Sequence, residues 1–90
     1  METSKLGGYT AFRKIDEKEK ALFAKTMNLK GVDYVPLAVA TQLVSGTNYR
    51  FLCEAKVVIP EPVPYNALVT IYAPLQGEAV ITEIKNVIIQ

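Results

Sequence analysis

From Tyr34 onward, apolar residues recur at nearly every second position, and this period constrains the fold more than any other feature. Two such runs, residues 35–41 and 49–59, lie on either side of a short turn at residues 42–46. A period of two is typical of strands with one buried face, so we predict a hairpin. The shared face of its first strand consists of Val35, Leu37, Val39 and Thr41. The shared face of its second strand consists of Tyr49, Phe51, Cys53, Ala55, Val57 and Ile59.

A helical pattern comes before these strands. Asp16, followed by Glu19, has the form of a capping box, because the aspartate side chain can accept from free N–H groups of a first helical turn. We predict a helix over residues 16–28 with one buried side. The predicted buried face consists of Ile15, Leu22, Phe23, Thr26, Met27 and Leu29. The predicted outer face consists of Lys18, Lys20, Ala24, Lys25 and Asn28. Gly31 stands where a left-handed cap would end the helix.

The rest of the chain completes an α+β pattern. The proline-rich residues 60–64 predict an exposed loop, because proline has no backbone N–H to donate. Strands are predicted at 67–73 and 78–89, around a turn that contains Pro74 and Leu75, and a short strand at 9–13 precedes the helix. This order predicts a four- to five-stranded antiparallel sheet wrapped across one α-helix. The 90 residues fit one domain, 1–90, with residues 1–8 as a flexible arm.

Composition narrows the classes of partner and the compartment. With 10 basic and 9 acidic residues the net charge is +1, so nucleic acid and membrane are poor candidates. The longest apolar runs are much shorter than the roughly 18 to 20 residues that span a bilayer. The N-terminus lacks the pattern of an export signal, which predicts a cytoplasmic protein, although a chain already trimmed of its signal would look the same. One cysteine allows no internal disulfide and favours a reducing compartment.

The chain offers little catalytic or metal-binding chemistry. Cys53 has no histidine to act as its base, since the chain contains none, and its place in the inward set of a strand predicts a small buried hydrophobe. One thiol and scattered carboxylates do not make a structural zinc site. The isolated acids on strands and loops are Glu54, Glu61, Glu78 and Glu83. We therefore predict no enzyme, no metal site and no cofactor.

Three short segments resemble parts of a known family. Gln42-Leu43-Val44-Ser45-Gly46 has the form Gln-x-Val-x-Gly, Leu6-Gly7-Gly8 precedes it, and Pro74-Leu75 follows it. In this order around a helix and four strands, the segments resemble the cystatins, protein inhibitors of papain-like cysteine proteases. The continuation Gly46-Thr47-Asn48-Tyr49 is closest to the intracellular, disulfide-free stefin branch. The chain departs from the pattern in two places: secreted cystatins usually have Pro-Trp where Pro74-Leu75 stands, and we associate no counterpart of the 60–64 loop with stefins.

The resemblance implies a reversible, tight-binding inhibitor whose arm and two hairpin turns fill the cleft of a cathepsin-type protease. The protease-binding residues that it implies are Leu6, Gly7, Gly8, Gln42, Leu43, Val44, Ser45, Gly46, Pro74 and Leu75. Leu6 would occupy an apolar substrate pocket, and the protease thiolate would be covered without being modified. The sequence leaves open whether the Gln42 amide acts as donor or acceptor. We expect Gly8→Trp, Val44→Asp and Gly46→Glu to weaken inhibition while folding stays largely intact.

Two alternatives share the same residues. One is a cystatin-like scaffold or interaction module without inhibitory activity. The other concerns assembly: a monomer is expected, but a hairpin with Leu43 and Val44 at its tip can also open and exchange with a neighbour as a domain-swapped dimer. An inhibition assay with purified monomer separates an inhibitor from these alternatives.

Overall fold

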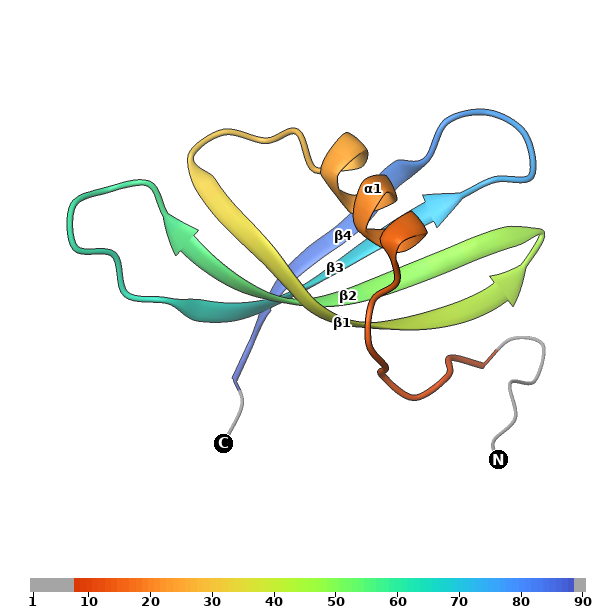
Figure 1. The fold of residues 1–90 in the computed structure, drawn as a ribbon, viewed down its shortest axis with the longest axis horizontal. Coiled ribbons are helices and arrows are strands. Elements are labelled where there is room, and N and C mark those ends of the chain that lie inside the picture. Colours follow the sequence, from red (N-terminus) through yellow and green to blue (C-terminus); the bar gives the residue numbers. More distant parts are fainter. Residues whose placement is uncertain (1–7, 89–90) are drawn as a thin grey trace.

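The computed structural model describes residues 8–88 of the chain. Its elements are α1 (Glu17–Thr26), β1 (Val32–Val44), β2 (Gly46–Val57), β3 (Tyr65–Ala73) and β4 (Val80–Val87). The four strands pair antiparallel in the order β1-β2-β3-β4, and α1 lies across one face of the curved sheet (Figure 1). This is the predicted α+β arrangement, and it is consistent with a cystatin-like fold.

The helix begins with the predicted capping box. The Glu19 N–H donates to Asp16 Oδ1 at 2.8 Å, and the Asp16 N–H donates to Glu19 Oε1 at 3.1 Å. Both bonds satisfy N–H groups that the first turn of a helix leaves without a helical partner. Asp16 is therefore the N-cap, and the helix starts at Glu17.

The end of the helix differs from the prediction. α1 ends at Thr26 with Met27 as its C-cap, whose N–H donates to the Phe23 carbonyl at 2.8 Å. Gly31 does have a left-handed backbone, with φ of 96°, but it lies just before β1 and not at the helix end. Its carbonyl accepts from the Val58 N–H at 2.9 Å, so Gly31 connects the start of β1 to the end of β2.

The core lies between α1 and the sheet. Its buried members are Phe23, Val39, Phe51, Cys53, Val69 and Ile71. The edge of the Phe23 ring packs against Phe51 with ring centroids 4.9 Å apart. The predicted inward set of the second strand is confirmed for Phe51, Cys53 and Ala55, all of which are buried, and is wrong for Val57 and Ile59, which are exposed near and beyond the end of β2. Leu29 was wrongly placed on the buried face of the helix, because the chain has left the helix there and the side chain is exposed.

A β-bulge in β1 breaks the period of two. The register shifts between Pro36 and Ala38, so Leu37 has no partner on β2. One extra residue moves the following side chains to the opposite face of the sheet. Tyr34 packs against the core before the bulge and Val39 lies within it after the bulge. The predicted face is therefore wrong for Val35 and Leu37, which are both about half exposed.

The second predicted hairpin and the proline-rich loop are confirmed, whereas the predicted strand at 9–13 is not. β3 and β4 form the second hairpin, although β4 spans Val80–Val87 where the sequence predicted 78–89. The connection from β2 to β3 contains the proline segment and is largely exposed, as predicted. Residues 9–13 form no continuous strand, because they meet β1 only at two isolated bridges, Tyr9 with Gln42 and Arg13 with Val39.

Candidate functional site

The first hairpin turn is tight, and its tip is apolar. β1 and β2 stay paired up to Val44 and Gly46, which leaves Ser45 alone at the tip. Gly46 has a φ of 100°, a backbone conformation that only glycine adopts without strain. The Leu43 side chain is 62% exposed, whereas a monomer usually places polar residues at such a tip. Val44 is half-buried.

Gln42 and Asn48 hold the base of this turn. They are directly opposite each other in the β1–β2 register, and Asn48 Nδ2 donates to Gln42 Oε1 at 2.7 Å. The sequence left open whether the Gln42 amide donates or accepts, and here its oxygen accepts a hydrogen bond across the hairpin. A cross-strand hydrogen bond at this position helps to fix the conformation of the turn before any partner arrives.

The first turn touches the second turn through Gly46. A Cβ atom at Gly46 would lie 2.4 Å from the Ala73 carbonyl oxygen and 3.0 Å from Pro74 Cα, both of them backbone atoms. The Tyr72 hydroxyl adds a bond, because it donates to the Ser45 carbonyl at 2.5 Å. The two turns therefore form one surface at the same end of the sheet, where both are visible in Figure 1.

This contact gives Gly46 a role in folding that the sequence did not indicate. Gly46 is buried, and the other turn occupies the space that a side chain would need. The expectation that Gly46→Glu leaves folding largely intact is therefore wrong, because any side chain must push the two turns apart.

The second turn carries the more exposed leucine. Residues 74–79 connect β3 to β4, and Leu75 is 79% exposed while Pro74 beside it is half-buried. Proline fixes its own φ, so the backbone next to Leu75 loses little freedom when a partner binds. Leu43 and Leu75 are thus two exposed apolar side chains on the two turns that Gly46 joins.

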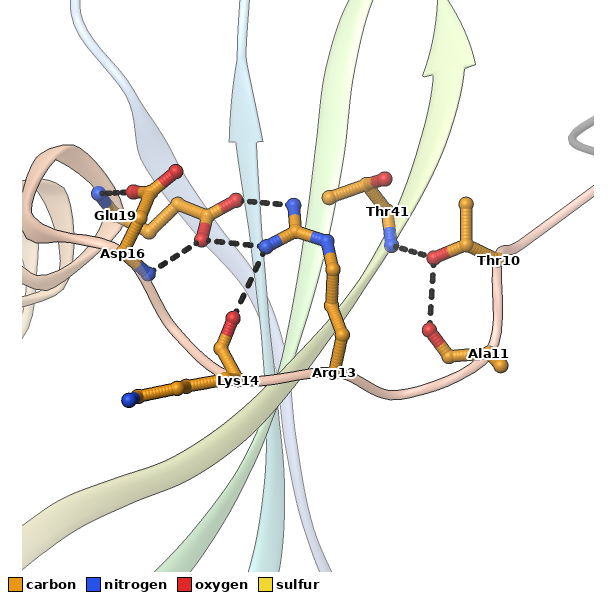
Figure 2. A network of polar contacts seen from close by, with 7 residues as sticks. All are labelled: Thr10, Ala11, Arg13, Lys14, Asp16, Glu19 and Thr41. Atoms are coloured by element: carbon orange, nitrogen blue, oxygen red, sulfur yellow. Dashed lines mark hydrogen bonds and ion pairs between the residues drawn. The ribbon is translucent and has the colours of Figure 1, made fainter.

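The N-terminal segment reaches the same end along the free edge of β1. Gly8 is the first described residue, and Leu6 and Gly7 lie outside the described residues. Next to Gly8, Tyr9 bridges to Gln42 at the base of the first turn. The Thr10 N–H donates to the Thr41 carbonyl at 2.8 Å. The Thr41 N–H donates to Thr10 Oγ1 at 3.0 Å (Figure 2).

Two charged side chains hold this segment in place. The Arg50 guanidinium lies 3.8 Å above the centre of the Tyr9 ring, a cation–π contact between β2 and the segment. Arg13 forms a two-pronged ion pair with Glu19 of α1, at 2.9 and 2.5 Å (Figure 2). This hydrogen-bonded pair lowers the pKa of the Glu19 carboxyl and raises that of Arg13. The segment is thereby attached to both the sheet and the helix.

Sequence reasoning missed the Arg13–Glu19 pair. It placed Glu19 in the capping box, which is correct, but its side chain is also buried and carries a second role. The available signal was an arginine shortly before a helix whose first turn is acidic. That pattern does not specify burial, because an acid in a first turn is usually solvated.

A groove beside the second turn was also not predicted. It has a volume of about 750 Å³ and separates the C-terminal half of α1 from the β3–β4 connection. Leu22 and Lys25 line it on the helix, and Ala73, Gly77 and Glu78 line it on the other side. It places a concave surface beside the connection that contains Leu75.

Cys53 lies away from this end, in the middle of the sheet opposite Pro36 and Ala67. It is fully buried, and burial raises the pKa of its thiol to about 12. The interpretation of Cys53 as a buried hydrophobe is therefore confirmed. Among residues 8–88, no three His, Cys, Asp or Glu side chains gather closely enough to hold a metal ion. Over the same residues, no helix has the length and apolar character needed to cross a bilayer.

Comparison with protein-family models and with curated proteins found no match for this chain. Of the ten residues that the sequence singled out, Gly8 and those of the two turns lie at one end of the sheet. The members of that set are Gly8, Gln42, Leu43, Val44, Ser45, Gly46, Pro74 and Leu75.

Proposed function

We propose that this chain is a reversible, tight-binding protein inhibitor of papain-like cysteine proteases. The N-terminal segment and the two turns would enter the active-site cleft and cover the protease thiolate without reacting with it. The single observation that supports this most is the contact of Gly46 with Ala73 and Pro74. It unites two turns that are far apart in the sequence into one ridge with exposed leucines.

The composition of this ridge suits insertion into a groove. Leu43 and Leu75 offer apolar area that water covers in the free protein, and their burial by a partner is favourable. The Gln42–Asn48 bond and the Tyr72–Ser45 bond hold the turns in shape beforehand, so little conformational entropy is lost on binding. An interface of standard size, about 1,600 Å² in total, requires no reactive group from the inhibitor.

A titration tests the proposal directly. Purified monomer is added to papain, and to a cathepsin, with a fluorogenic peptide substrate. We expect activity to fall with rising inhibitor concentration and to return after dilution, with the inhibitor recovered at its full mass. If micromolar protein leaves both enzymes active, the proposal is wrong, and the scaffold without inhibitory activity takes its place.

A matched pair of variants then locates the binding surface. Leu75 and Val63 are equally exposed, at 79% and 82%, but Val63 lies in the β2–β3 connection at the other end of the sheet (Figure 1). Leu75→Glu should raise the inhibition constant at least roughly tenfold, mainly through faster dissociation, and Val63→Glu should leave it unchanged. Equal effects of the two changes would contradict binding through the turns.

A further inference from the structure

The two edges of the sheet differ in how far they are protected from pairing with other chains. The outer edge of β1 is covered in part by residues 9–13, and it also carries Pro36 and the bulge at Leu37. Proline, bulges and covering segments all keep an edge strand from pairing with other chains. β4 is the last strand at the opposite edge; it has a register shift at Thr82 but no proline, and within residues 8–88 no strand pairs with its outer side (Figure 1). Most of its side chains are exposed.

The order of side chains along β4 is complementary to itself. Glu83 and Lys85 lie opposite Thr70 and Leu68 of β3, on the face away from the helix, and Ile84 between them lies on the helix side, opposite the buried Val69. When β4 is turned end to end about Ile84, Glu83 and Lys85 therefore exchange places on the same face of the sheet.

Only one register of an antiparallel pair uses this symmetry. With Ile84 opposite Ile84 of a second copy, each Glu83 faces a Lys85, and these pairs occur twice. A shift by two residues places Glu83 opposite Glu83, or Lys85 opposite Lys85, which repels. A shift by one residue joins the helix side of one copy to the outer side of the other.

We propose that two copies of this chain pair antiparallel through the free edges of β4, centred on Ile84, and continue the sheet across a two-fold axis. The charges that discourage pairing with unrelated strands are, in this register, attractive between identical copies. The paired stretch is residues 83–85, because the register shift between Glu83 and Ile81 leaves Thr82 without a β3 partner and interrupts the strand there, and the two-fold axis limits the other end in the same way. A stretch this short gives a weak dimer that salt weakens further.

The geometry of this dimer differs from that of a swapped one. Antiparallel pairing reverses the second copy, so the ends that carry the two turns point in opposite directions and both stay accessible. A swap at the first hairpin would instead straighten the turn at Ser45 and Gly46 and remove the ridge. The edge dimer also forms without any unfolding, so its subunits exchange rapidly.

Analytical ultracentrifugation of the full chain over a range of concentrations tests the pairing. We expect the wild type to pass from monomer to dimer as its concentration rises. Glu83→Lys places like charges in both pairs and should raise the dimer dissociation constant about tenfold or more. The double variant Glu83→Lys with Lys85→Glu restores opposite charges and should dimerise like the wild type. Circular dichroism checks that each variant is folded.

Three results would overturn the pairing: a wild type that stays monomeric up to millimolar concentration, a Glu83→Lys variant that dimerises as before, or a double variant that is not restored. The last result would indicate that β4 pairs with a different segment. No protease is used, so the outcome is independent of whether the chain is an inhibitor.

Discussion

Replacing Gly46 by alanine tests the contact between the two turns, on which the candidate site depends. Two costs add up at this position. A residue with a side chain lowers the free energy of unfolding by about 1–2 kcal/mol when it adopts the left-handed backbone conformation that Gly46 has. Its Cβ would also stand 2.4 Å from the Ala73 carbonyl oxygen, so the turns must separate, and overpacking of this kind costs about 1–3 kcal/mol.

The sum predicts that Gly46→Ala lowers the free energy of unfolding by about 2–5 kcal/mol. For a domain of this size, about 3 kcal/mol corresponds to a fall in Tm of roughly 12–24 °C. Urea unfolding followed by circular dichroism measures the free energy, and a thermal scan measures Tm. If the slope of the free energy of unfolding against urea concentration is the same as in the wild type, the substitution has changed stability and not the surface that unfolding exposes.

Two other glycines serve as controls because they share the conformation without the contact. Gly77 has a φ of 104° and its nearest atom to a Cβ is Pro74 Cγ at 3.8 Å, while Gly31 has a φ of 96° and nothing within 4 Å. Alanine at either position should cost only the conformational part, about 1–2 kcal/mol. If Gly46→Ala costs no more than these two variants, the turns are not in contact in solution and the ridge does not exist as described.

Three further predictions concern the residues that hold the site in place. The pKa of Glu19 is lowered from its ordinary 4.5, so the stability that it contributes is present above about pH 4.5 and lost as the pH falls through the folded value. Glu19→Gln should therefore destabilise the protein at pH 7 and flatten the pH dependence of unfolding below about pH 4.5. The Cys53 thiol, with its pKa raised to about 12, should react with Ellman's reagent near pH 8 only after unfolding; rapid labelling of the folded protein would contradict its burial. Arg50→Met removes the cation–π contact with the Tyr9 ring, which stabilises the attached segment by roughly 0.5–1 kcal/mol. Hydrogen exchange at the Thr10 amide should therefore become about two- to fivefold faster. Unchanged exchange would mean that the ring contact does not anchor the segment.

The elements of this fold could be predicted because their signals are local. The capping box at Asp16 and Glu19 depends on neighbouring residues, and the inward set of β2 follows one uninterrupted period from Phe51 to Ala55. The bulge at Leu37 could not be read in the same way, because a strand with one extra residue has the same composition as a regular strand. The sequence therefore placed Val35 on the wrong face.

The candidate site was predictable in its membership but not in its internal contacts. The turn residues were identified from a family resemblance, and the β-strand order then places both turns at one end. That Gly46 packs against Ala73 depends on the register of β2 with β3, in which the adjacent Thr47 lies opposite Ala73, and no local pattern specifies this register. The Arg13–Glu19 pair was missed for a similar reason, since it joins residues on two different elements.

The proline-containing connection between β2 and β3 lies at the end of the sheet opposite the two turns (Figure 1). Its Val63 side chain is almost fully exposed, and the nearby Val58 N–H anchors the connection to Gly31. A dye, a linker or an immobilising tag attached to the thiol of a Val63→Cys variant would thus leave the end with Leu43 and Leu75 facing outward, since the other thiol, Cys53, is buried. A sensor surface coated through this position would display every copy in the same orientation.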